Sequence, residues 1–203
     1  MVGLLFAMLE EAKPYISKYH WRKKDFKSKF PVYEGSYLNE PCFAVISGVG
    51  KANAAVATAL LKDLEVDTII NIGSCGANSK NLKVGDVVIP SQLYDGDFDL
   101  SKFGKNTKNP YNLSQSQENG LKCYTFSKFV TEKIDHDDYV VDMECYAIAC
   151  LCDYFKIKFI PVKIISDNAN ENAVNDFDGN IDTVMEDSIN KVEKLIQRRL
   201  HQC

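Results

Sequence analysis

The acidic residue with the clearest opportunity for chemistry follows an apolar run in the C-terminal part of the chain. Residues 157–165 are almost continuously apolar and lead directly into Ser166 and Asp167, after which the sequence turns polar. Such a run predicts a central strand of a parallel sheet, covered on both faces. Ligands of open α/β sheets bind beyond the carboxyl ends of such strands, so Asp167 is a candidate for chemistry on a bound ligand. The alternative is that Asp167 only caps a turn or the next helix.

Two further acids, Glu10 and Glu11, lie near the N-terminus. They follow residues 2–8, which predict a buried strand, and they open a helix expected to begin at Leu9. Because the helix dipole favours acids in a first turn, a structural explanation suffices for this pair taken alone.

Two junctions rich in small residues follow expected strands. Residues 47–51 (SGVGK) lead into an alanine-rich helix, and residues 73–77 (GSCGA) follow a strand at 67–72. A glycine-containing strand end that opens a helix lets backbone N–H groups approach a ligand oxygen or a phosphate. Residues 47–51 lack both the complete dinucleotide-binding pattern and the P-loop pattern, so they do not identify a ligand by themselves.

Alternating strands and helices must position these residues. Strands are expected at residues 2–8, 30–37, 41–47, 67–72, 87–90, 122–131 and 157–165, with an extended start at 139–144. Helices are expected from residue 9, over 51–64 and 145–155, and at the C-terminus, where apolar residues recur at helical spacing from 181 to 200. Residues 94–117 are polar and turn-rich, which predicts a long loop. The chain has no internal repeat or linker, so residues 1–203 are expected to form a single domain.

The composition narrows the class of protein. With 45% hydrophobic and 26% charged residues, the chain is typical of a soluble globular protein. Its net charge of -4 argues against a nucleic-acid partner. The basic cluster at residues 22–24 is interpreted as the solvated face of an edge strand or loop. No apolar run is long enough for a membrane span, and the apolar start lacks the basic region of a signal peptide.

The cysteines and histidines argue against a metal site. The seven cysteines show no repeated spacing, and the three histidines, His20, His136 and His201, are dispersed. Free, mostly buried thiols in a reducing cytoplasm are therefore expected, and no zinc site.

Six short motifs occur in a consistent order along the chain. They are residues 7–11 (AMLEE), 47–51 (SGVGK), 73–76 (GSCG), 82–88 (LKVGDVV), 142–147 (DMECYA) and 165–167 (ISD). Together they resemble the 5'-methylthioadenosine/S-adenosylhomocysteine nucleosidase group of the nucleoside phosphorylase superfamily. The resemblance covers most of the chain and implies an α/β fold: a three-layer α/β/α sandwich with a mixed central sheet. It implies no cofactor and no metal.

The resemblance implies catalytic roles for three carboxyl groups. Asp167 matches the acid that protonates or hydrogen-bonds N7 of the purine, and Glu11 matches the carboxylate that activates the attacking water. Glu144 matches the acceptor of the ribose hydroxyls, beside Met143. A carboxyl with a pKa near ~3.9 is almost fully ionised at neutral pH, so the acid needs a raised pKa. Burial at the end of an apolar strand raises it.

The resemblance also implies which residues bind the substrate. Ser74 lies on the water and ribose side, and Ser166 adjoins the acid. Phe129 and Val130 match the positions that stack on the purine and contact its edge. The 5'-substituent pocket is expected to be formed by Met8, Val49 and Phe177, completed by Leu100 and Phe103 from the partner subunit of a homodimer.

This chain departs from the family pattern in three places. Residues 126–128 read FSK where the family has Gly-Asp before the stacking Phe129. The segment 104–141 is shorter than usual, and residues 73–77 resemble the phosphorylase version of that turn. These departures bear on the purine pocket.

Three alternatives to a methylthioadenosine-type hydrolase stay open. A phosphorylase binds phosphate through arginines, but the chain has only Arg22, Arg198 and Arg199, and Asn71 stands where bacterial phosphorylases carry an arginine. A futalosine-type hydrolase would use the same machinery. A catalytically silent nucleoside-binding protein would be favoured by loss of any of the three carboxylates, and all three are present.

Overall fold

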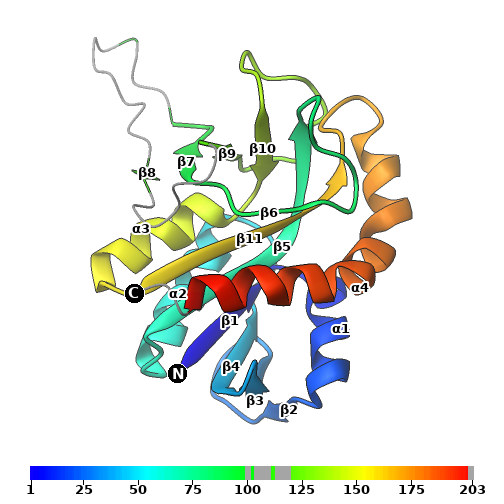
Figure 1. The fold of residues 1–203 in the computed structure, drawn as a ribbon. Coiled ribbons are helices and arrows are strands. Elements are labelled where there is room, and N and C mark those ends of the chain that lie inside the picture. Colours follow the sequence, from blue (N-terminus) through cyan, green and yellow to red (C-terminus); the bar gives the residue numbers. More distant parts are fainter. Residues whose placement is uncertain (99–101, 103–110, 113–119, 201–203) are drawn as a thin grey trace.

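The computed structural model describes residues 1–98, 102, 111–112 and 120–200. These residues form one eleven-stranded sheet with four α-helices (Figure 1). The strands are β1 Val2–Phe6, β2 Arg22–Lys24, β3 Val32–Tyr37, β4 Glu40–Ile46, β5 Thr68–Asn78, β6 Val87–Val88, β7 Gln92–Asp95, β8 Tyr111–Asn112, β9 Lys122–Thr125, β10 Tyr139–Asp142 and β11 Lys158–Asp167. The helices are α1 Leu9–Tyr19, α2 Lys51–Asp63, α3 Cys145–Phe155 and α4 Ala173–Leu200.

The sheet is mixed, as the resemblance implied. The strand order is β2-β3-β4-β1-β5-β10-β9-β7-β8, with β11 paired to β5 and β6 paired to β11. The pairs of β1 with β4 and β5, and of β5 with β11, are parallel, whereas β10 runs antiparallel to β5.

Helices cover both faces of the sheet because successive side chains of a strand point to opposite sides. Val2, Leu4 and Phe6 of β1 share one core cluster with residues of α1 and α4. Leu5 lies in a second cluster, with residues of α2 and α3. The α/β/α arrangement is thereby confirmed, and Figure 1 shows the helices on the two sides of the strands.

Strand β11 is central, as the apolar run predicted, and pairs with β5 from Lys158 to Asp167. The strand expected at residues 67–72 corresponds to β5, and its expected end at residue 72 is wrong, because β5 continues to Asn78. Its last residues remain hydrogen-bonded since β11 lies on one side and β10 pairs antiparallel with residues 76–78.

Other boundaries differ where tertiary contacts decide them. The strand expected at 122–131 ends at Thr125, because the backbone of Phe126 turns to donate to the Asp142 carbonyl at 2.9 Å. The expected loop at 94–117 contains β8 and the end of β7. Among the described residues, no helix is long and apolar enough to cross a membrane.

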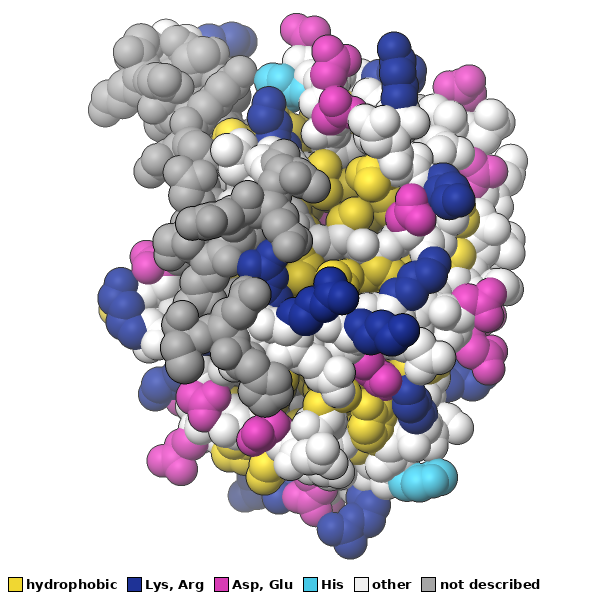
Figure 2. All heavy atoms as spheres, viewed as in Figure 1, with side chains coloured by type: hydrophobic (Ala, Val, Ile, Leu, Met, Phe, Trp, Pro, Cys, Tyr) yellow, Lys and Arg dark blue, Asp and Glu magenta, His cyan; other side chains and the backbone are white. Residues whose placement is uncertain are grey.

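The basic cluster at 22–24 forms β2, an edge strand of the sheet, as expected. Arg22 and Lys24 both contact the carboxylate of Glu34 on the neighbouring strand, at 3.7 and 2.6 Å. In the view of Figure 2, basic, acidic and apolar side chains are interspersed over one face of the molecule.

Candidate active site

One cavity collects nearly all of the residues that the sequence singled out. It has a volume of about 410 Å³, which suits a small-molecule ligand. The predicted residues that line it are Met8, Val49, Ser74, Phe129, Val130, Met143, Glu144, Ser166, Asp167 and Phe177. Glu11 lies directly behind this wall, whereas Leu100 and Phe103 fall outside the described residues.

Asp167 ends β11 and lies at the cavity wall with only 2% of its surface exposed. Its Oδ1 accepts the Ala169 N–H at 2.9 Å, so Asp167 caps a turn, as the structural alternative expected. Gly76 lies so close that a Cβ there would be 2.6 Å from Oδ1. Burial raises the pKa of Asp167, against the hydrogen bonds from Ala169 and Ser166 that lower it. The net effect is a pKa of Asp167 above that of a free aspartate.

Ser166 is fully buried behind Asp167 and contacts it directly. Its hydroxyl lies 2.9 Å from Oδ2 of Asp167 and 3.2 Å from the carbonyl oxygen of Cys75. The side chain of Asn180 on α4 donates to the Ser166 carbonyl at 3.1 Å. These contacts hold the end of β11, and with it the orientation of Asp167.

Glu11 is 2% exposed and accepts four hydrogen bonds. Oε2 accepts the N–H groups of Ala7 and Met8 at 2.9 and 3.1 Å, which caps α1. Oε1 accepts the N–H and the hydroxyl of Ser74 at 2.8 and 2.9 Å. Burial raises the pKa of Glu11, opposed by these hydrogen bonds and by the Lys163 ammonium. Glu11 thus caps its helix, as the dipole argument required, and also joins α1 to β5 at the cavity.

Glu144 precedes α3 and faces the junction at residues 47–51. Its Oε1 accepts the Gly50 N–H at 2.8 Å, and Gly50 has a φ of 106°, which favours glycine. The expectation that this N–H binds a ligand oxygen or phosphate is therefore wrong for Gly50, because the protein supplies the acceptor. Burial and the nearby Asp142 carboxylate raise the pKa of Glu144 to about 7, although Lys163 lowers it.

A buried ion pair that the sequence interpretation missed lies beside these acids. The Lys163 ammonium is 2.6 Å from Oδ2 of Asp142, and each side chain is only 1% exposed. The positive charge of Lys163 also acts on Glu11 and Glu144, whose pKa values it lowers. The signal was present, because a lysine inside an apolar strand requires a buried partner.

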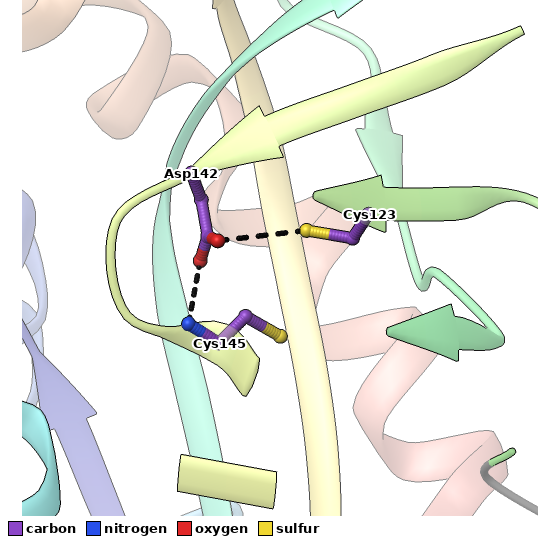
Figure 3. A group of neighbouring side chains, drawn as sticks. All are labelled: Cys123, Asp142 and Cys145. Carbon is purple, nitrogen blue, oxygen red and sulfur yellow. Dashed lines mark hydrogen bonds between the residues drawn. The ribbon is translucent and has the colours of Figure 1, made fainter. Parts of the chain in front are cut away.

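Three potential metal ligands, Cys123, Asp142 and Cys145, come together at the cavity wall, which Asp142 lines (Figure 3). Their ligand atoms lie within 4.8 Å of one another. The Asp142 oxygens already accept hydrogen bonds from the Thr125 hydroxyl at 2.6 Å, the Cys145 N–H at 2.8 Å and the Cys123 thiol at 3.6 Å. The Lys163 ammonium also pairs with this carboxylate and balances its charge. We therefore interpret the three residues as a hydrogen-bonded cluster that holds the start of α3.

The opposite part of the cavity is largely apolar. The rings of Phe129 and Phe177 meet edge to face, with centroids 5.6 Å apart and planes at 73°. Lys128, Val141, Val174 and Asp178 also line the cavity and were not anticipated. An apolar wall opposite a group of carboxyls suits a ligand with an aromatic ring and a polar, hydroxylated part.

Comparison with known proteins agrees with this geometry. The model of the phosphorylase superfamily matches residues 1–136 and 134–197. A 5'-methylthioadenosine/S-adenosylhomocysteine nucleosidase from Buchnera aphidicola is 31% identical, covering 98% of each chain. The crystal structure of the nucleosidase of that name from Neisseria meningitidis, in complex with methylthio-immucillin-A, is similar with a TM-score of 0.83 and 26% identity, covering 97% of this chain and 98% of that one.

A futalosine hydrolase of Helicobacter pylori shares the fold, with a TM-score of 0.84 at 21% identity over 97% of each chain. This likeness concerns the fold alone, whereas the family model and the Buchnera relative extend over almost the whole sequence. The chain therefore belongs to the phosphorylase superfamily and, within it, to the 5'-methylthioadenosine/S-adenosylhomocysteine nucleosidase family.

Proposed function

We propose that this protein hydrolyses the N-glycosidic bond of 5'-methylthioadenosine, S-adenosylhomocysteine or a related purine nucleoside and releases the free base. The observation that carries the proposal is the grouping of Glu11, Glu144 and Asp167, all buried and all with raised pKa values, around one cavity. The names of the relatives in the same family support this substrate class.

Asp167 is proposed as the general acid. Cleavage of the bond leaves negative charge on the departing purine, and a proton delivered to N7 removes it. An acid does this only if it is protonated when the substrate binds, and the burial of Asp167 favours that state. Ser166 behind the carboxyl group keeps it directed at the cavity.

Glu11 is proposed as the base that activates water. All four of its hydrogen bonds come from the protein, so one must open before a water can bind. The Ser74 hydroxyl is the donor that can leave, because a hydroxyl rotates about its C–O bond and a backbone N–H does not. Ser74 lines the cavity, which supports a water bound there beside Glu11.

Glu144 and the apolar wall are proposed to hold the substrate. Charged Glu144 accepts hydrogen bonds from the ribose hydroxyls and stabilises the positive charge that develops on the sugar. Phe129 and Val130 contact the purine, and Met8, Val49 and Phe177 surround the 5'-substituent. All five line the same cavity as the carboxyls, beside Met143.

Water rather than phosphate is proposed as the nucleophile. No arginine is among the residues that line the cavity in the described part of the chain. The Gly50 N–H, which would suit a phosphate oxygen, is bound to Glu144. We expect adenine release from 5'-methylthioadenosine at the same rate with and without phosphate, and a free sugar as the second product.

The test is an adenine-release assay with phosphate as the variable and identification of the sugar. A ribose 1-phosphate product, or release that requires phosphate, would show a phosphorylase. A panel that includes futalosine separates the futalosine-type alternative. Nucleoside binding without release of any base would show a silent binding protein.

The pH dependence follows from the raised pKa values. Below a pH of about 7, Glu144 gains a proton and can no longer accept from the ribose hydroxyls in its charged form. At higher pH, Asp167 loses the proton it must donate, although burial moves this loss upward. We therefore expect a bell-shaped profile of kcat/KM whose acid limb lies near pH 7. Constant kcat/KM between about pH 5 and 8 would contradict these assignments.

We further propose that the protein is a homodimer of single-domain chains, residues 1–203, that acts in the cytoplasm in methionine salvage. Four apolar side chains at or beside the cavity, Leu9, Val49, Phe129 and Val174, are between 38% and 51% exposed, which supports a covering partner subunit. Six described cysteines are free thiols, which is typical of a reducing compartment. Light scattering of the purified protein measures the oligomeric state.

A further inference from the structure

A network of charged groups connects two loops that border the cavity. Lys51, the first residue of α2, places its ammonium 2.8 Å from Oδ1 of Asp95 and 2.7 Å from Oδ2 of Asp97. The same Oδ2 of Asp97 accepts the N–H of Ser127 at 2.7 Å. The N–H of Asp97 in turn donates to Oδ1 of Asp95 at 3.0 Å. Three segments far apart in the sequence are thereby joined at one carboxylate.

Both loops carry residues of the cavity wall. Lys51 directly follows Gly50, which binds Glu144, and Val49, which lines the cavity. Ser127 directly precedes the stretch 128–130, all of which lines the cavity. The Asp97 carboxylate therefore holds the loop of Phe129 in a fixed relation to the start of α2.

The segment that carries Asp97 is also packed against the Phe129 loop. A Cβ on Gly96 would lie 2.4 Å from the ring of Phe126, so a larger residue there would displace that ring. The Gly96 N–H donates to the Thr125 carbonyl at 2.8 Å. The loop is thus attached at Phe126 by packing and at Ser127 by the charged hydrogen bond of Asp97.

We propose that Asp97, together with Lys51, is a positioning residue that sets the place of Phe129 and Val130 and thereby the affinity for the purine base. The proposal rests on the proposed function in that the ligand is a purine. It accounts for the departure at residues 126–128, where this chain reads FSK. In this chain, the carboxylate of Asp97, which lies outside the loop, binds the backbone of the loop at Ser127.

The groups are partly exposed, which sets the size of the effect. The side chains of Lys51, Asp95 and Asp97 are 22%, 22% and 35% exposed, so solvent and salt screen their attraction. We expect a loss of about five-fold in affinity when the network is broken. Within the described part of the chain, the hydrogen bonds of Asp97 are with Lys51, Asp95 and Ser127, and none is with Glu11, Glu144 or Asp167. We therefore expect the effect mainly on KM and on base affinity rather than on kcat.

The experiment measures the Kd of adenine by calorimetry, with KM and kcat on 5'-methylthioadenosine. We expect Asp97→Asn and Lys51→Met each to weaken adenine binding by about five-fold. The double variant is expected to be no weaker than the weaker single variant, because the two residues act through one contact. Lys51→Arg keeps the cation and is expected to bind adenine as tightly as the wild type. Added salt is expected to lower the adenine affinity of the wild type more than that of Asp97→Asn or Lys51→Met.

Asp63→Asn, at the other end of α2, is the matched control. It removes an exposed ion pair with Lys62 at 3.3 Å, away from the cavity, and is expected to bind adenine like the wild type. Thermal unfolding of each variant verifies folding. Lys51→Met removes the other member of the Lys51–Asp97 ion pair, so the proposal can still be tested if Asp97→Asn folds poorly.

The possible failures are distinguishable. Unchanged adenine affinity in Asp97→Asn and Lys51→Met, beside base release by the wild type, would overturn this inference alone. Weakened affinity in the variants of a protein that releases no base would sustain it and overturn the proposed function. A wild-type protein that releases base but does not bind adenine would overturn this inference and leave the proposed function intact.

Discussion

Asp167→Asn is expected to leave the protein folded and to lower base release by about 100- to 10,000-fold. Asparagine has nearly the same shape and can accept the Ala169 N–H as Oδ1 does now. It has no acidic proton, so the purine would depart as an anion. The loss should appear in kcat, because the substrate-binding wall is unchanged.

The direction of the stability change in Asp167→Asn follows from the pKa of Asp167. The pKa of Asp167 is raised by burial in the folded protein. Its contribution to stability is therefore complete below the unfolded pKa and is lost as the pH rises through the raised folded pKa. The amide of asparagine is neutral at every pH, like the protonated carboxyl group, and can accept the Ala169 N–H, so the melting temperature at neutral pH should not fall.

The measurement combines adenine release with thermal unfolding at neutral pH. Asp153→Asn, at a residue that is 56% exposed on α3, is the control and should retain full activity. Substantial turnover by Asp167→Asn would remove Asp167 from the role of general acid. A folded Asp167→Asn protein without activity, beside an active Asp153→Asn protein, is the expected pair of results.

Lys163→Met is expected to lower the free energy of unfolding by about 3–5 kcal/mol. The Lys163–Asp142 pair is 1% exposed on both sides, so the variant leaves a carboxylate buried without its positive partner. Asp142 also binds the Cys145 N–H and the Thr125 hydroxyl, and its displacement would loosen the start of α3. Because Glu144 immediately precedes α3, base release should fall together with stability.

Urea unfolding measures this change, and matched variants assign its cause. Lys163→Arg keeps a cation and should retain most of the stability. The double variant Lys163→Met with Asp142→Asn removes both charges and should recover part of the loss. Lys156→Met, at a residue 79% exposed, should change the free energy of unfolding by less than about 0.5 kcal/mol. A Lys163→Met protein as stable as Lys156→Met would refute the importance of the buried pair.

The pH dependence of the ion pair also has a definite direction. The pKa of Lys163 is raised well above its ordinary value: burial lowers it, but the Asp142 carboxylate and the other acidic groups nearby outweigh that effect. Its stabilising contribution is therefore complete below the unfolded pKa of lysine and is lost only as the pH rises through the raised value. The pair should persist throughout the neutral range in which the enzyme is assayed.

Local sequence patterns were sufficient for the parts of the fold in which burial repeats regularly. The apolar run before Asp167 predicted a central strand, and β11 is that strand. The helix expected at 145–155 has the same bounds in the structure. The position of Asp167 after this run marked it as a candidate, and the family resemblance of the motifs implied the other nine predicted residues that line the cavity, together with Glu11 directly behind it.

Other features depended on contacts between distant segments. The extension of β5 past residue 72 requires pairing with β10 and β11, which follow later in the chain. Ser74 meets Glu11 across 63 residues, and Gly50 meets Glu144 across 94. The contact of Glu11 with Ser74 and that of Glu144 with Gly50 could not be predicted from residue spacing, because each joins segments that only the folded chain brings together.

By itself, the sequence determined the kinds of elements and the acid that ends β11, because periodicity and strand ends are local properties, and the order of its six motifs indicated the family. Only the tertiary structure decided which groups share a charge environment. Lys163 and Asp142 form their pair because β11 and β10 both pair with β5, and this pair acts on the pKa values of Glu11 and Glu144. The physical reason is that burial and electrostatic coupling depend on distances in space, which residue spacing along the chain does not contain.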